Sequence, residues 1–240
     1  GGRERCFVLL LNPLMAVLTN IDADHMETYE GDFDKLRSGF IEFFKRLPFY
    51  GFAVICIDDP NSFSMLPELR TRVVTYGTHE QADIRGFDFQ QHETTSTYKV
   101  EIQNSSHVIP ITLNMPGEHN MLNSLAAIAI AKELRLSNEA IVSALSSFQG
   151  VGRRCQWMGE TRIGSKRVAV IDDYGHHPSE IRVTIKAVRT GWPSRRLVVA
   201  FQPHRYSRTR DLFEDFVDVL NVTDALVILE VYPAGEHPIP

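Results

Sequence analysis

The chain has 240 residues, of which 43% are hydrophobic, and a formal net charge of −5 at pH 7. These values fit a globular protein of one large or two ordinary domains, and the acidic balance argues against a nucleic-acid partner. No apolar run reaches the roughly 18 residues of a membrane span, no signal peptide opens the chain, and the three cysteines lack CxxC spacing. We therefore expect a cytoplasmic protein without membrane insertion, disulfides or a zinc site.

The first part of the chain predicts a parallel βαβ unit. Residues 15–20 read as a buried strand, residues 32–47 as a helix with aromatic residues at helical spacing, and residues 53–57 as a second strand. Each strand runs into a group of ionisable side chains. These are Asp22, Asp24 and His25 after the first strand, and Asp58 and Asp59 after the second.

Residues 72–113 have a different pattern. Short alternating runs at 73–76, 97–102 and 108–111 are separated by glycine and polar residues, which predicts antiparallel strands packed on the α/β core. Two helices are expected next, over residues 121–134 and 139–148.

Gly150 and Gly152 then interrupt the pattern, and we expect a hinge and a domain boundary there. After it, residues 168–171, 196–201 and 225–229 predict three strands with helices between them. This arrangement indicates two domains, residues 1–150 and 151–240, of which the second is a smaller parallel α/β domain.

The loop after residues 168–171 carries the most concentrated set of reactive side chains: Asp172, Asp173, Tyr174, His176 and His177. In open α/β sheets, ligands bind beyond the carboxyl ends of the strands, where this loop would lie. Its carboxylates and imidazoles could hold a metal or transfer protons. A plain loop remains the alternative, because neighbouring side chains on a loop do not necessarily converge.

Two further clusters carry chemistry. Asp22, Asp24 and His25 could bind a divalent cation, or could simply place acidic residues at a helix N-terminus. His204, Arg205 and Arg208 are suited to a carboxylate or phosphate, with a solvated basic turn as the alternative. The chain contains no GxxxxGK[ST] motif, so it cannot cradle a triphosphate in the P-loop manner by itself.

Five motifs, in this order, resemble the Mur ligases, and the similarity covers nearly the whole chain from Leu11 onward. They are TNIDADHM at 19–26, GEHNMLN at 117–123, GVGRR at 150–154, DDYGHHP at 172–178 and FQPHRYSRTR at 201–210. The resemblance implies a parallel-sheet ATP-binding central domain with an antiparallel β subregion, followed by a smaller Rossmann-like α/β domain. The last motif favours the branch that joins L-alanine to UDP-N-acetylmuramate through an acyl phosphate.

The resemblance also implies roles for individual residues, with ATP and Mg²⁺ as cofactors. Catalytic roles fall to Arg154, His176 and Arg205. Contacts to the nucleotide fall to Asn120, Asn123, Arg153, Asp173 and Tyr174. Contacts to the amino acid and the sugar nucleotide fall to His204, Arg205 and Arg208, and the magnesium ligand is His25.

Two departures from the family pattern lead to further expectations. The P-loop and the acidic segment that precede the first strand in family members are not present, and the chain stops before the last part of the C-terminal domain. We therefore expect an internal piece of the enzyme that is inactive by itself. Two alternatives stay open: a metal-dependent phosphohydrolase built on Asp24, His25, Asp173 and His176, and a non-catalytic nucleotide-binding protein derived from the same fold.

Overall fold

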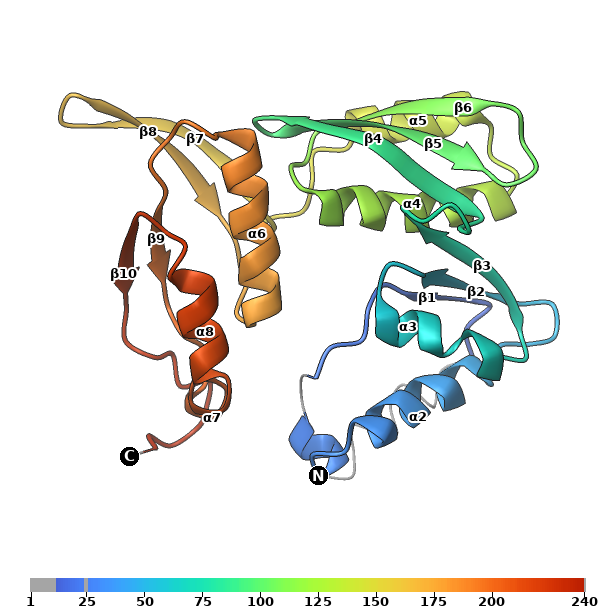
Figure 1. Cartoon of the computed structure of the whole chain (residues 1–240), viewed down its shortest axis with the longest axis horizontal. Coiled ribbons are helices and arrows are strands. Elements are labelled where there is room, and N and C mark those ends of the chain that lie inside the picture. The colour runs from blue at the N-terminus through green and yellow to red at the C-terminus, as the bar shows by residue number, and fades with distance from the viewer. Residues whose placement is uncertain (1–11, 24–25, 240) are drawn as a thin grey trace. The chain divides into compact units, whose positions relative to one another are not determined.

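The structure is a computed structural model that describes residues 12–23 and 26–239. It divides into two compact units (Figure 1). The first unit comprises the chain up to Phe89 together with Thr97–Thr112 and His119–Ser147. The second comprises Phe148–Pro240 and two short segments that precede the expected boundary, Gln90–Ser96 and Leu113–Glu118.

A mixed six-stranded sheet forms the framework of the first unit, in the order β1-β2-β3-β4-β5-β6. Three parallel strands lie side by side, with Ala16 beside Ala53 and Ala53 beside Val73. The strands are β1 (Met15–Leu18), β2 (Phe52–Cys56), β3 (Arg72–Gly77), β4 (Ile84–His92), β5 (Thr95–Ile102) and β6 (Val108–Leu113). The α/β class with a mostly parallel sheet is thus confirmed.

The orientation predicted for residues 73–76 is wrong. They belong to β3, which runs parallel to β2 and is followed by the parallel start of β4. The chain between β2 and β3 contains α3 (Pro60–Ser64) and a 3-10 helix at Leu66–Glu68, which together make a crossover connection. Antiparallel pairing begins later, because only residues 93–94 separate the neighbouring strands β4 and β5.

Helices cover the sheet of the first unit. After a 3-10 turn at Met26–Tyr29, α2 (Phe33–Phe44) starts at Asp32, whose side chain accepts hydrogen bonds from the amides of residues 34 and 35. Its buried residues pack into a core cluster with residues of β1 and β2. Helix α4 (Glu118–Glu133) begins three residues before the predicted start and precedes α5 (Asn138–Ser147). Tyr98 of β5 and Ser124 of α4 share a buried hydrogen bond, which ties that helix to the sheet.

The second unit contains a hairpin and a small parallel sheet. Strands β7 (Gln156–Ile163) and β8 (Lys166–Asp172) pair antiparallel, and β9 (Val198–Phe201) and β10 (Ala225–Ile228) pair parallel. The connecting helices are α6 (Pro178–Gly191), α7 (Tyr206–Asp211) and α8 (Phe213–Leu220). Apolar residues of α6, β9 and α8 form one core cluster: Ile181, Ile185, Phe201, Phe216, Val219 and Leu220.

The sequence did not predict β7. In the segment that the structure describes, β8 pairs only with β7, so β8, β9 and β10 do not form the single parallel array expected from their pattern. Among the described helices, none is long and apolar enough to cross a membrane.

Candidate functional site

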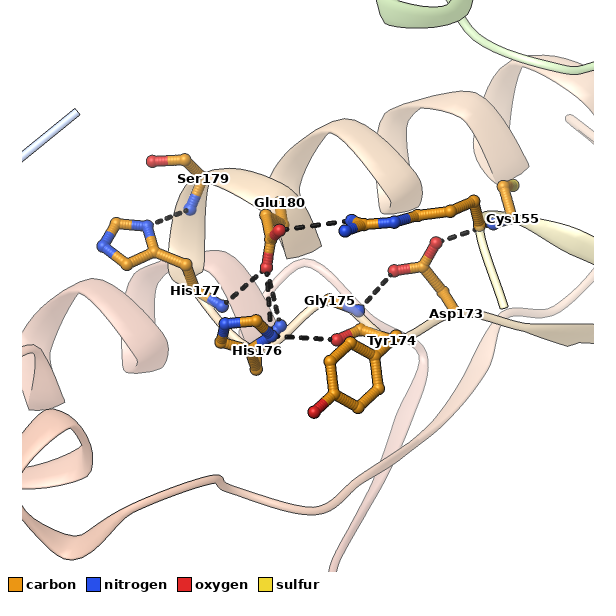
Figure 2. Close-up of polar contacts among 9 residues, drawn as sticks. Cys155, Asp173, Tyr174, Gly175, His176, His177, Ser179 and Glu180 are labelled. Atoms are coloured by element: carbon orange, nitrogen blue, oxygen red, sulfur yellow. Dashed lines mark hydrogen bonds and ion pairs between the residues drawn. The ribbon is translucent and has the colours of Figure 1, made fainter. Parts of the chain in front are cut away.

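The loop between β8 and α6 is fastened by the carboxylate of Asp173 (Figure 2). One oxygen accepts the backbone N–H of Cys155 at 2.7 Å, and the other accepts the N–H of Gly175 at 2.7 Å. A Cβ at Gly175 would lie 2.6 Å from the same carboxylate, so this close approach requires glycine. Burial, and then the charge of Asp173, raise the pKa of the Cys155 thiol to about 12. This cysteine is therefore a packed structural residue with an unreactive thiol.

A second carboxylate, Glu180, holds the other side of the same loop. Its Oε2 accepts the N–H groups of His176 at 2.9 Å and His177 at 3.2 Å, while Oε1 lies 3.2 Å from the guanidinium of Arg154. His177 caps α6 and forms a capping box with Glu180. Burial opposes ionisation of Glu180, but the backbone donors and the neighbouring charges of His176 and Arg154 outweigh it and lower the pKa of its carboxyl.

The Arg153–Cys155 turn lies against this loop. The Tyr174 N–H donates to the Arg153 carbonyl at 2.8 Å, and the Arg153 guanidinium lies 4.7 Å from the centroid of the Tyr174 ring. The same guanidinium is 3.5 Å from a carboxylate oxygen of Asp172. Arg153 and Cys155 both have positive φ, 58° and 47°, so the turn is held in a conformation that residues other than glycine rarely adopt.

The loop after β9 meets the loop after β8 through aromatic rings. His204 lies 5.6 Å from His176 and 6.5 Å from Tyr174 between ring centroids, and it stacks on Tyr232 at 5.4 Å. Burial, and then the positive charges of His176, Arg208 and Arg205, lower the pKa of His204. Two loops far apart in sequence thus form one cluster.

Arg205 and Arg208 add positive charge beside this cluster. Arg205 is exposed and precedes α7, with its N–H donating to the Tyr232 carbonyl at 2.9 Å. Its φ of 72° is again in the left-handed region. Arg208, one turn along, is a buried residue of α7. At the start of this helix, the Glu236 carboxylate accepts from the N–H of Ser207 at 3.0 Å and from its hydroxyl at 2.6 Å.

The remaining predicted site residues lie elsewhere. Asn120, which is buried, and Asn123, which is exposed, are in the first two turns of α4 in the first unit. Their part in the site stays a prediction, because the positions of the two units relative to one another are not determined (Figure 1). His25, the predicted magnesium ligand, lies outside the described residues. Among the residues that are described, no group of three or more His, Cys, Asp or Glu side chains could hold a metal ion.

Sequence reasoning missed two residues of this cluster. Glu180 could have been found, because it stands three positions after His177 at a helix start that Pro178 marks. Tyr232 has no such signal: it comes after β10, and only the pairing of its backbone with His204 brings its ring to the site.

These features can be compared with known proteins. The chain matches the family model described as Mur ligase middle domain over residues 3–131, and the one described as Mur ligase, glutamate ligase domain over residues 153–239. The chain belongs to the Mur ligase family. The family resemblance that the sequence suggested is therefore confirmed.

Solved Mur ligase structures agree with this assignment. UDP-N-acetylmuramate-alanine ligase MurC from Thermotoga maritima is 27% identical, with a TM-score of 0.74, over 93% of this chain and 47% of that protein. MurF from Thermotoga maritima, in complex with ADP, is 20% identical, with a TM-score of 0.76, over 94% and 50%. A murein peptide ligase from Psychrobacter arcticus is 18% identical, with a TM-score of 0.63, over 93% and 51%. The last two show the fold alone, and the chain spans about half the length of each.

Proposed function

We propose that this chain forms the central and C-terminal parts of an ATP-dependent ligase that joins L-alanine to UDP-N-acetylmuramate. Family membership supports an ATP-dependent amide ligase of peptidoglycan precursor synthesis. The likeness to the Thermotoga maritima alanine ligase and the basic FQPHRYSRTR segment support the choice of L-alanine. Such an enzyme would act in the cytoplasm on small molecules, and in cells it would serve wall growth, shape and division.

In the proposed reaction, a muramate carboxylate oxygen attacks the γ-phosphorus of ATP and ADP leaves. The resulting acyl phosphate is attacked by the amine of L-alanine, which forms the amide, releases phosphate and gives up a proton. Anions must therefore be bound at each stage. Arg205 and Arg208, with His204 beside them, provide planar cationic groups suited to carboxylate and phosphate oxygens. We assign catalytic roles to Arg205, Arg154 and His176.

The family resemblance also supports a set of nucleotide contacts. Asn120 and Asn123 are proposed to contact adenine, and Arg153 to face phosphate. Tyr174 and Asp173 are proposed to lie near the ribose. Each oxygen of Asp173 already accepts one backbone N–H, and a carboxylate oxygen has a second acceptor site for a ribose hydroxyl.

Magnesium is also proposed as a cofactor. A divalent cation would neutralise phosphate oxygens in this reaction, and His25 is the residue proposed to bind it. The described residues provide no cluster that fits a cation. The proposal for the metal therefore rests on the family resemblance, and no step of the reaction is assigned to it here.

One observation carries the functional proposal: the loops after β8 and β9 meet, with His176 and His204 5.6 Å apart, and place imidazoles and guanidinium groups together at strand ends. The test is phosphate release from ATP by the longest polypeptide that the gene encodes. We expect release with UDP-N-acetylmuramate and L-alanine together, and a product with the mass of their amide. Replacing L-alanine by 2,6-diaminopimelate or D-alanyl-D-alanine, which the names of two related ligases indicate, should abolish it.

The other outcomes separate the alternatives. Phosphate release without any amino acid would favour a phosphohydrolase. Nucleotide binding without turnover would favour a non-catalytic binding protein. Ligation of diaminopimelate or D-alanyl-D-alanine, but not L-alanine, would keep the family and overturn the proposed substrate.

A further inference from the structure

Glu180 makes more contacts than a helix cap needs. Its carboxylate accepts the N–H groups of both His176 and His177, and it also pairs with Arg154 from the turn that precedes β7. In addition, Oε2 lies 3.5 Å from Nδ1 of the His176 ring. One side chain thus contacts the backbone and the ring of His176 together with an arginine from a distant part of the chain (Figure 2).

The surroundings of the His176 ring determine which nitrogen carries the proton. Nδ1 lies 3.1 Å from the Tyr174 carbonyl oxygen and 3.5 Å from the Glu180 carboxylate. A carbonyl oxygen and an ionised carboxylate can only accept, so Nδ1 must donate. In the neutral imidazole the proton therefore sits on Nδ1, and Nε2 carries the lone pair.

Glu180 is ionised in this setting for a structural reason. Two backbone donors and the Arg154 guanidinium point at a half-buried carboxylate, and each of them favours the charged form. The charge in turn strengthens the preference for a proton on Nδ1, because a negative oxygen is a stronger acceptor than a carbonyl. Arg154 acts on the ring only through Glu180, by holding its other oxygen.

We propose that Glu180 is a positioning residue for His176: it fixes the ring orientation and the Nδ1–H tautomer, so that Nε2 is presented as a proton acceptor. The source of the proton that Nε2 accepts rests on the proposed function. In an amide-forming ligase, the attacking amine must lose a proton, and an imidazole nitrogen in the neutral form can take it. The carboxylate and the histidine would then work as an orienting group and a base, while Glu180 itself touches no substrate.

The first arm of the test uses the chain as it stands. In 15N-histidine NMR spectra recorded above pH 8, His176 should show the Nδ1–H tautomer. Glu180→Gln keeps a side-chain oxygen for the helix cap, since glutamine also serves at this position, but it removes the charge and cannot satisfy the backbone donors and Arg154 together. We expect a clear rise in the Nε2–H population of His176 in this variant.

Glu160→Gln is the matched control. Glu160 is a charged residue of the same unit that pairs with Arg167 and Arg195, away from the loop. Its loss should weaken the fold without changing the His176 tautomer. An Nε2–H tautomer in the wild type, or equal tautomer populations in the wild type and Glu180→Gln, would overturn the proposal.

The second arm uses the longer ligase. Glu180→Gln should lower kcat by about ten- to a hundredfold, as for other groups that orient a reacting side chain, and should leave the KM for ATP nearly unchanged. Glu160→Gln should keep wild-type kcat. Wild-type kcat in Glu180→Gln would overturn the positioning role. If the wild-type polypeptide does not ligate at all, the proposed function fails, and the NMR arm still decides how Glu180 acts on His176.

Discussion

Arg205 has a strained backbone conformation, and the cost of this strain can be measured. We also propose that its side chain binds substrate. Its φ of 72° and ψ of 136° lie in a region that only glycine adopts readily. Hydrogen bonds hold the backbone of Arg205 in this conformation. Its N–H donates to the Tyr232 carbonyl at 2.9 Å, and its own carbonyl accepts the hydroxyl of Thr209 at 2.7 Å. A residue in such a conformation costs on the order of 1–3 kcal/mol.

Comparing Arg205→Gly with Arg205→Ala isolates this cost, because both variants lose the same guanidinium. Glycine relieves the strain but makes the unfolded chain more flexible, which costs about 0.5–1 kcal/mol. The glycine variant should therefore be more stable than the alanine variant by about 0.5–2 kcal/mol. With a typical urea m-value of about 1–3 kcal/mol/M, a difference of about 1 kcal/mol moves the midpoint by about 0.3–1 M.

Tryptophan fluorescence reports on the relevant unit. The chain has two tryptophans, Trp157 and Trp192, which stack at 5.6 Å within the second unit. Arg210 serves as the control, since it lies inside α7 with helical backbone, where glycine should be less stable than alanine by about 1 kcal/mol. If Arg205→Gly is no more stable than Arg205→Ala, the strain argument is wrong. In the ligase, both Arg205 variants should lose substrate affinity whatever their stability.

Two further predictions concern stability. The pKa values of Glu160, Glu180, Asp224 and Glu236 are lowered in the folded state by hydrogen bonds and neighbouring charges. Such groups stabilise the fold above their unfolded pKa, so urea midpoints of the second unit should fall as the pH drops below about 4.5, after an earlier loss below about pH 6.5 that follows from the lowered pKa of His204; a constant midpoint between pH 5 and pH 3 would contradict the carboxylate effect. Gly77→Ala should destabilise the first unit by about 1–3 kcal/mol in circular dichroism melts, because its Cβ would lie 2.1 Å from an oxygen of the Asp58 carboxylate, which accepts two bonds from Thr78. Gly39→Ala, at a helical site with only ordinary contacts, should be neutral or stabilising, and equal losses in both variants would refute the steric reasoning.

The sequence was sufficient to locate most elements, because apolar patterning is decided locally. Strands β1, β2 and β8 to β10 lie where apolar runs predicted them. The direction of a strand in the sheet was harder to predict. The alternating run 73–76 has the same pattern in a parallel and in an antiparallel strand, and only the connection that precedes it determines the direction. The sequence also did not reveal β7, because all eight of its residues are partly or fully exposed and Gly159 lies in its middle.

Missing β7 also concealed two contacts of the site. The hairpin register pairs Gln156 with Asp172, which brings the Arg153–Cys155 turn next to the loop that starts at Asp173. If the hairpin is not known, the GVGRR motif at 150–154 predicts only a hinge and no contact with the loop. With the hairpin, the contacts from the Arg153 carbonyl to Tyr174 and from Arg154 to Glu180 follow from strand pairing.

In the second unit, acidic residues stabilise the loops, and basic residues supply the positive charge of the cluster. The carboxylates of Asp173, Glu180 and Glu236 each accept backbone N–H groups, and so they hold loops in place. Backbone N–H groups occupy one acceptor site on each oxygen of Asp173, so this carboxylate helps to hold the loop in place. The guanidinium groups of Arg205 and Arg208 lie beside the imidazoles, so the cluster favours anions. A carboxylate and a phosphate, which an acyl-phosphate ligase must bind in succession, are the ligands that this charge pattern suits.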